Sequence, residues 1–237
     1  MISRRDFVAG TASAVLATPQ GRRRPNFLVF LVDDLGCHDL GCWGASDLQT
    51  PNIDALAASG ARFTNWYAAA PVCAPSRAAL LTGRYPIRAG VPDNGRPLRP
   101  TERTIASLLQ PAGYATGLIG KWHLGDTADT VPNAHGFERF FGFHSGCFDY
   151  YSHRYYWGEP RTVNYHDLWR DRSEVFEDGQ YATELFAREA AASCASAATG
   201  RSSCTCRLTR RTIRCMRPTV TCSASRASAA SAARMPR

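Results

Sequence analysis

The feature that most constrains the fold is a run of apolar residues near the beginning of the chain. Residues 27–32 are Phe, Leu, Val, Phe, Leu and Val in succession. A short, uninterrupted apolar run is typical of a strand that is buried on both faces, as central strands of parallel sheets are. Residues 114–120 form a second apolar run. The sequence therefore predicts an α/β fold with a central, mostly parallel sheet flanked by helices.

Two carboxylates, Asp33 and Asp34, directly follow the first apolar run. They are expected at the carboxyl end of a strand, which is the edge where ligands of open α/β sheets bind. Adjacent carboxylates repel each other unless a cation neutralises them, and oxygen ligands suit Ca²⁺ or Mg²⁺. The alternative is a solvated strand end with an Asx turn. These two residues alone leave both interpretations open.

The stretch from Pro71 to Gly83 predicts a helix with a thiol just ahead of it. Pro75 suits the first helical position and Gly83 can end the helix. Cys73 would then face unpaired N–H groups at the positive end of the helix dipole, where anions bind. Arg77 offers a planar set of donors that suits sulfate or phosphate. For an isolated cysteine, a buried position on an ordinary loop and helix is the more common alternative.

The second apolar run delivers Lys121 and His123 to the same predicted sheet edge as the two aspartates. Each has an ordinary alternative, because a lysine is usually solvated and a histidine is often packed. Helices are also expected at residues 50–60, 105–109 and 182–192, a short strand at residues 63–67, and an irregular segment at residues 84–100.

Aromatic residues are dense between Phe140 and Trp169. Together with His144, His153 and His166, they either line a pocket for a sugar or aryl group or form an insertion that packs on itself. The Cys and His residues in the loop after the first strand are expected to pack there, because they lack a fourth metal ligand.

Residues 1–25 have the pattern of a twin-arginine (Tat) export leader. Arg4 and Arg5 precede a weakly apolar run from Val8 to Ala17, which is too short to span a bilayer. The pattern predicts export by the Tat machinery to the periplasm or the exterior of a bacterium. A disordered basic N-terminus is the alternative.

The formal net charge of +8 does not indicate a nucleic-acid partner. Nine arginines and no acidic residue lie between Ser193 and Arg237, which leaves 19 basic and 20 acidic residues in the rest of the chain. This tail also holds no aromatic residue, so we expect residues 193–237 to be disordered and outside the fold.

A basic arm is one explanation of the tail, and a shifted reading frame is another. If each codon is read as the last base of the preceding codon plus its own first two bases, the residues from Ser202 to Cys206 can become Phe, Phe, Leu, Tyr or His, and Leu. This shifted sequence is mostly apolar, as the sequence of a buried strand is. We prefer the shifted frame.

The Cys-x-Pro-Ser-Arg pattern at Cys73, followed by Leu-Leu-Thr-Gly, resembles the signature of the type I sulfatases. Residues 113–123 resemble the second signature of that family, and the similarity runs from about Pro25 to Ala192. The resemblance implies an alkaline-phosphatase-like sandwich, incomplete at its C-terminus, with residues 26–192 as the N-terminal part of the catalytic domain.

The resemblance also implies a sulfuric ester hydrolase that acts on a sugar or aryl sulfate. Cys73 matches the residue that a formylglycine-generating enzyme oxidises to formylglycine. The implied metal residues, usually for calcium, are Asp33, Asp34 and Cys73. The positions that match sulfate-contacting residues are Arg77, Lys121 and His123.

The family's further metal ligands lie beyond the similar region and have no counterpart in place here, so we expect this chain to be inactive or poorly folded. Two alternatives remain. A related metal-dependent phosphatase or phosphodiesterase would carry Ser or Thr as the nucleophile. A non-catalytic, carbohydrate-binding or inert fragment would keep a free thiol at Cys73.

Overall fold

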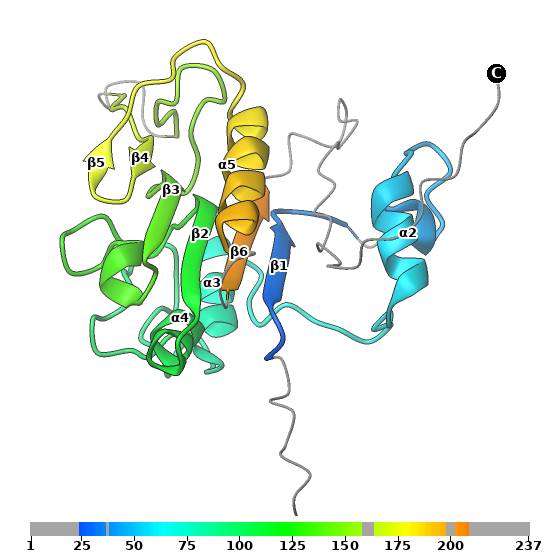
Figure 1. The fold of residues 1–237 in the computed structure, drawn as a ribbon, viewed down its shortest axis with the longest axis horizontal. Coiled ribbons are helices and arrows are strands. Elements are labelled where there is room, and N and C mark those ends of the chain that lie inside the picture. Colours follow the sequence, from blue (N-terminus) through cyan, green and yellow to red (C-terminus); the bar gives the residue numbers. More distant parts are fainter. Residues whose placement is uncertain (1–23, 37, 158–163, 198–201, 209–237) are drawn as a thin grey trace, which may run out of the picture.

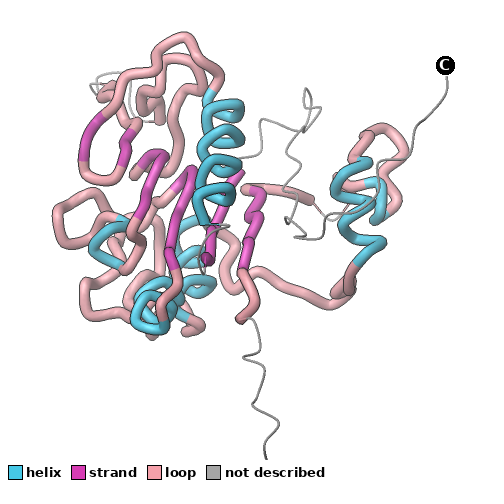
Figure 2. The backbone as a smooth tube through the Cα atoms, in the orientation of Figure 1, coloured by secondary structure: helices cyan, strands magenta, loops and turns pink. Residues whose placement is uncertain are grey.

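The computed structural model describes residues 24–36, 38–157, 164–197 and 202–208 of the chain (Figures 1 and 2). Its centre is an open six-stranded sheet in the order β1-β6-β2-β3-β4-β5. The pairs β1-β6, β6-β2 and β2-β3 are parallel, and the pairs β3-β4 and β4-β5 are antiparallel. The prediction of a mostly parallel sheet is confirmed.

The strands are β1 (Phe27–Val32), β2 (Ala115–Lys121), β3 (Arg139–Phe143), β4 (Trp169–Arg170), β5 (Ser173–Glu174) and β6 (Ser202–Leu208). The α-helices are α2 (Pro51–Ser59), α3 (Cys73–Thr82), α4 (Ile105–Leu109) and α5 (Ala182–Ala197). Short 3-10 helices are η1 (Gly41–Trp43), η2 (Gln110–Ala112) and η3 (Pro132–His135).

Helices cover both faces of the central strands, with α5 crossing one face in Figure 1. Successive residues of a strand point to opposite faces, and Leu118 and Ile119 of β2 show the consequence. Leu118 belongs to a buried cluster with Ala78 of α3 and Ala106 of α4. Ile119 belongs to a second cluster with Phe186 of α5. The sheet therefore separates two apolar cores. No helix in the described part of the chain is both long enough and apolar enough to cross a membrane.

Strand β1 differs from its prediction in burial. It lies at an edge of the sheet, and its side chains from Phe27 to Phe30 are exposed. An edge strand has a neighbour on one side only, so an apolar run by itself predicts the strand but not the cover over its faces.

The structure corrects the prediction that the tail lies outside the fold. Helix α5 extends to Ala197, and β6 lies between β1 and β2, parallel to both. Its register places Ser203 opposite Phe27 and Ser202 opposite Ala115. The backbone edges of β1 and β2 require partners whatever the side chains are, which is why composition alone misjudged this segment. Residues 209–237 lie outside the described residues.

Among the smaller elements, helices α2 and α4 and the irregular segment at residues 84–100 are confirmed. The predicted strand at residues 63–67 is wrong. These residues form a turn flanked by irregular chain, and Phe63, Trp66 and Tyr67 are exposed. Aromatic residues favour a strand only where a neighbouring strand can pair with it.

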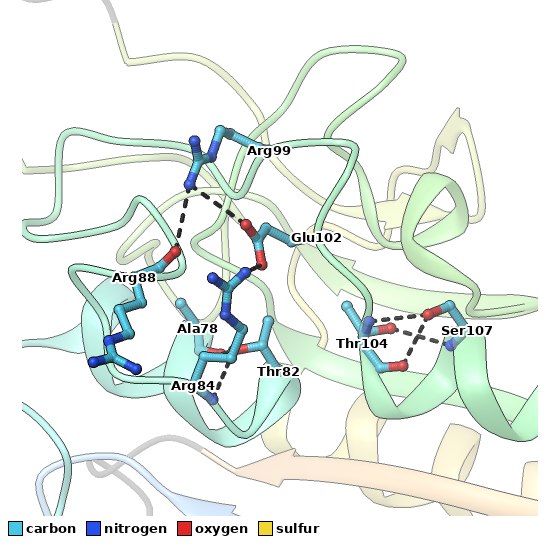
Figure 3. Close-up of polar contacts among 8 residues, drawn as sticks. All are labelled: Ala78, Thr82, Arg84, Arg88, Arg99, Glu102, Thr104 and Ser107. Carbon is cyan, nitrogen blue, oxygen red and sulfur yellow. Dashed lines mark hydrogen bonds and ion pairs between the residues drawn. The ribbon is translucent and has the colours of Figure 1, made fainter.

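Hydrogen bonds hold the irregular segment, residues 84–100, in place near α3 and near the start of α4 (Figure 3). Near α3, the buried carboxylate of Glu102 accepts hydrogen bonds from Arg84 and Arg99. At the start of α4, Thr104 N donates to Ser107 Oγ at 2.9 Å and Ser107 N donates to Thr104 Oγ1 at 3.1 Å, a reciprocal capping box. These bonds fix the path of the residues between them, some of which reach the candidate site.

Candidate functional site

The carboxyl ends of β1 and β2 meet the beginning of α3 around one cavity of about 700 Å³. Asp33 and Asp34 follow β1, Lys121 and His123 lie at the end of β2, and Cys73 is the first residue of α3. All five side chains line this cavity. Parallel strands place their carboxyl ends at one sheet edge, so the predicted residues come together although they are up to 90 positions apart in the sequence.

Beside the cavity lies a buried cluster of charges centred on Asp33. Arg77 Nη2 donates to Asp33 Oδ1 at 2.7 Å, and Lys121 Nζ donates to Asp33 Oδ2 at 2.8 Å. Arg77 Nη1 also donates to the carbonyl oxygen of Lys121 at 3.1 Å. The side chains of Arg77 and Lys121 are 2% and 3% exposed. Arg77 is not part of the cavity lining, so in this structure it orients Asp33 instead of facing an anion there.

The two cations decide the charge of Asp33. Burial by itself would raise the pKa of this carboxyl group, but Arg77 and Lys121 outweigh burial and hold the pKa below the ordinary value of 3.8. Asp33 is therefore ionised at neutral pH. Each of its oxygens has a second lone pair, so it can accept a metal ion as well as the two donors.

His123 is neutral at pH 7, unlike Arg77 and Lys121 beside it. Burial is the largest cause, followed by the nearby charges of Lys121 and Arg77, and together they lower its pKa from 6.5 to about 4. Its Nδ1 atom is buried without a hydrogen-bond partner. The ring lies so close to Gly146 that a Cβ atom there would be 2.6 Å from His123 Cε1.

Asn94 is a site residue that the sequence analysis missed. Its Oδ1 accepts a hydrogen bond from the backbone N–H of Ala74 at 2.9 Å, and it lines the cavity beside Cys73. Helix α3 has Val72 at its N-cap and no side-chain cap of its own, so Asn94 supplies that acceptor from a distant loop. Cys73 opens the helix, where it was predicted just before it, and Gly83 ends the helix as predicted.

The aromatic segment divides between the two predicted roles. Its phenylalanines are buried in the cores, although Phe143 and Phe148 also reach the cavity wall. The other aromatic residues that line the cavity are Tyr150, Tyr155, Tyr156 and Trp157. His144 and His166 line an adjoining cavity of about 450 Å³, which His123 also borders. His153 is buried and lines neither of these cavities.

Asp33 and Asp34 offer the kind of oxygen ligand that calcium binds, but too few of them. Both offer hard oxygen ligands, whereas Ca²⁺ takes about six to eight oxygens. Among the described residues, the cluster of three potential His, Cys, Asp or Glu ligands consists of His153, His166 and Asp178, and it does not include the two aspartates. This cluster lies outside the lining of the cavity that holds Cys73.

Comparison with known proteins identifies related chains. A steryl-sulfatase from Rattus norvegicus is 50% identical over 135 residues, which cover 50% of this chain and 23% of the relative. An N-acetylgalactosamine-6-sulfatase from Sus scrofa is 38% identical over 180 residues, which cover 70% of this chain and 34% of the relative. This chain therefore spans about a quarter to a third of these relatives.

Solved structures agree with these relatives. The crystal structure of Ps i-CgsB superposes with a TM-score of 0.73 at 34% identity, covering 80% of this chain and 46% of that chain. The structure of BT4656 in complex with its substrate D-glucosamine-2-N,6-O-disulfate gives a TM-score of 0.65 at 30% identity, covering 78% and 34%. The fold is thus the alkaline-phosphatase-like α/β fold of sulfatases. Since the sulfatase family model also matches residues 25–199, the chain belongs to the sulfatase family.

Proposed function

We propose that this chain carries part of the active site of a sulfuric ester hydrolase. The supporting observation is that Cys73, Asp33, Asp34, Lys121 and His123 line one cavity in a chain of the sulfatase family. The proposed substrate is a sulfate ester of a sugar or an aryl alcohol. An aromatic wall suits the flat face of either ring. One relative is named an N-acetylgalactosamine-6-sulfatase, and one similar solved structure holds a sulfated glucosamine as its substrate.

Cys73 is the proposed precursor of the nucleophile. A thiolate that attacked sulfur would be trapped as a stable thiosulfate-like adduct. Oxidation of Cys73 to formylglycine by a formylglycine-generating enzyme supplies instead an aldehyde, whose hydrate provides the attacking hydroxyl group and a route for releasing sulfate. The side chain lies at the first residue of α3, where the helix dipole favours negative charge.

The surrounding residues have distinct proposed roles. Lys121 places positive charge at the cavity wall, which stabilises the anionic oxygens of the substrate. His123, which is neutral at pH 7, can accept a proton at one ring nitrogen or donate an N–H to a sulfate oxygen. Arg77 is a positioning residue, since it acts through its ion pair with Asp33.

Calcium is the proposed metal, held in part by Asp33 and Asp34, and it would neutralise charge on the sulfate group. These two carboxylates fall short of the number of oxygens that calcium takes. We therefore propose that the chain as written binds calcium weakly and hydrolyses sulfate esters poorly or not at all.

Most of the twin-arginine leader, residues 1–23, lies outside the residues that the structure describes. Export by the Tat machinery to the periplasm or the exterior remains part of the proposal, and its support is the sequence pattern of residues 1–25. Replacing Arg4 and Arg5 with Lys should retain a fused reporter in the cytoplasm. Unchanged export of the Lys variant would contradict this assignment.

A shifted reading frame in the tail also remains a proposal, and the position of β6 supports it. This strand has a parallel neighbour on both sides, which is where strands are normally continuous apolar runs. The present sequence from Ser202 to Leu208 is mostly polar, whereas translation in the shifted frame can supply Phe and Leu at these positions. Sequencing the gene decides the matter, because codons that cannot encode the shifted text would refute the proposal.

The test of the function begins with co-expression of the chain and a formylglycine-generating enzyme. Mass spectrometry of the peptide that contains Cys73 should find the aldehyde, and Cys73→Ala provides the control. Release of sulfate and of phosphate from matched aryl esters is then measured with added calcium. A free thiol at Cys73 would refute the modification and favour the inert fragment. Measurable sulfate release that is equal in the parent and in Cys73→Ala would refute the nucleophile.

A further inference from the structure

Three side chains that lie outside the lining of the Cys73 cavity converge on one point. The metal-ligating atoms of His153, His166 and Asp178 all lie within 4.8 Å of one another. They come from three segments: the loop that follows β3, the chain that leads into β4, and the turn before α5. Backbone bonds bring the first two together, because Asp167 N donates to the carbonyl oxygen of His153 at 2.8 Å.

The hydrogen bonds of the two imidazoles leave one nitrogen of each ring without a hydrogen-bond partner. His166 Nδ1 lies 2.9 Å from Glu174 Oε1, and an ionised carboxylate can only accept, so Nδ1 carries the proton. His153 Nε2 lies 3.1 Å from the carbonyl oxygen of Gln180, so Nε2 carries the proton of that ring. In the neutral rings, the other nitrogens, His166 Nε2 and His153 Nδ1, are lone-pair atoms. Both are buried and have no hydrogen-bond partner.

Simple packing accounts poorly for this arrangement. A buried polar atom without a partner costs about 1–3 kcal/mol, and two such atoms occur here in one cluster. His153 is fully buried and His166 nearly so, while the Asp178 side chain is 51% exposed. Asp178 Oδ2 is 3.9 Å from His166 Nε2, which is too far for a hydrogen bond but near enough for both to bind the same ion.

We propose that His153, His166 and Asp178 form a metal site that takes Zn²⁺ and fastens the aromatic wall of the cavity to the beginning of α5. Two imidazoles and one carboxylate are a donor set that zinc favours and that calcium and magnesium do not. Glu174 and the carbonyl oxygen of Gln180 hold the rings, as outer partners of zinc-binding histidines do.

The geometry requires a modest contraction. Zinc binds imidazole nitrogen at about 2.0–2.1 Å, which places tetrahedral ligands about 3.3 Å apart. Asp178 can make much of this movement because it is exposed and lies in a turn. Water would take the fourth position.

The position of the site gives it a structural role. His153 lies two residues before Tyr155, which lines the cavity together with Tyr156 and Trp157. Asp178 lies four residues before the first residue of α5. A metal ion that joins them would hold the aromatic loop against the helix and so keep the shape of the cavity wall.

The test uses the full chain after dialysis against EDTA. Isothermal titration with ZnCl₂ should show one equivalent bound, together with a rise in the thermal unfolding temperature that CaCl₂ and MgCl₂ do not produce. Asp178→Asn should weaken zinc binding by at least about tenfold, since even loss of an outer partner costs about 10–100-fold. Glu177→Gln is the matched control, because it removes the same charge one residue away and should bind as the parent does.

Asp178 is exposed, so its variant is expected to fold, and circular dichroism verifies this. His153→Ala is the second variant and should abolish the zinc-dependent rise in unfolding temperature. Zinc binding that is absent in the parent would overturn the proposal. Binding of equal affinity in the parent and in folded Asp178→Asn would also overturn it, since the ion would then lie elsewhere. None of these measurements depends on hydrolysis, so they stand apart from the proposed function.

Discussion

Replacing Asp33 with Asn should destabilise the fold strongly, because it removes the carboxylate charge that two buried cations bind. Arg77 and Lys121 are almost fully buried, and their ion pairs with Asp33 measure 2.7 and 2.8 Å. An amide keeps the shape of the side chain but offers one acceptor oxygen and no charge. One of the two cations therefore loses its hydrogen bond to residue 33, and both lose the negative charge beside them.

The magnitude follows from the burial of the three groups. Removing one partner of a buried ion pair costs about 3–5 kcal/mol. The Asp33 side chain is 18% exposed, so water screens part of the charge, and we expect a loss of about 3 kcal/mol. With a typical urea dependence of about 1–3 kcal/mol per molar for a small protein, the midpoint of urea unfolding should fall by at least about 1 M.

The assay is urea unfolding at neutral pH followed by tryptophan fluorescence, with Asp34→Asn as the matched control. Asp34 is the neighbouring carboxylate, and no ion pair of the described residues includes it. A double variant that adds Lys121→Met to Asp33→Asn should lose less stability than the sum of the two single variants.

The pH dependence provides a second readout of the same cluster. Because the pKa of Asp33 in the folded state lies below 3.8, its stabilisation is complete above the unfolded pKa and is lost as the pH falls through the folded value. Asp33→Asn should remove this part of the acid transition. The reasoning would be refuted if Asp33→Asn unfolded within about 0.5 kcal/mol of the parent, or if Asp34→Asn were equally costly.

The remaining predictions concern single contacts. The pKa of His123 falls from 6.5 to about 4 on folding, so the free energy of unfolding of the parent should fall by about 2 kcal/mol between pH 7 and pH 5. His123→Gln should lose less over that range. Equal changes of unfolding free energy with pH in the two proteins, measured by urea titration, would contradict the pKa. Gly146→Ala should lower the free energy of unfolding, measured by thermal unfolding, by about 1–3 kcal/mol, because its Cβ would clash with the His123 ring. A Cβ at Gly60 meets only ordinary contacts, so Gly60→Ala should lower it by less than about 1 kcal/mol. Thr104→Ala should lower the free energy of unfolding by about 1–2 kcal/mol, because it removes the capping box and a buried hydrogen bond. Thr101 is exposed, so Thr101→Ala should lower it by under about 0.5 kcal/mol. Similar urea midpoints for the two variants would count against the capping box.

Local patterns predicted the elements that present the site. The apolar runs before Asp33 and Lys121 gave β1 and β2, and the Pro-rich start and Gly83 end of the Cys73 helix gave α3 within one or two residues. These features depend on backbone preferences and side-chain periodicity over a few neighbouring residues, which are present in the sequence itself.

Long-range packing decided what those residues touch. The sequence places Arg77 one turn into a helix, but only the fold shows that Asp33, 44 positions away, is its partner. Likewise, nothing in an irregular loop indicates that Asn94 reaches the start of α3. The strand position of β6 also went against its composition, because the backbone edges on both sides determine that pairing.

By itself, then, the sequence determined which strand ends and which helix start carry the carboxylates, the lysine and the cysteine, since each is specified by its immediate neighbours. Only the tertiary structure decided the neutral state of His123 and the convergence of His153 with Asp178. Burial, nearby charge and ligand geometry are properties of side chains that meet across the fold, and no local pattern encodes which of them will meet.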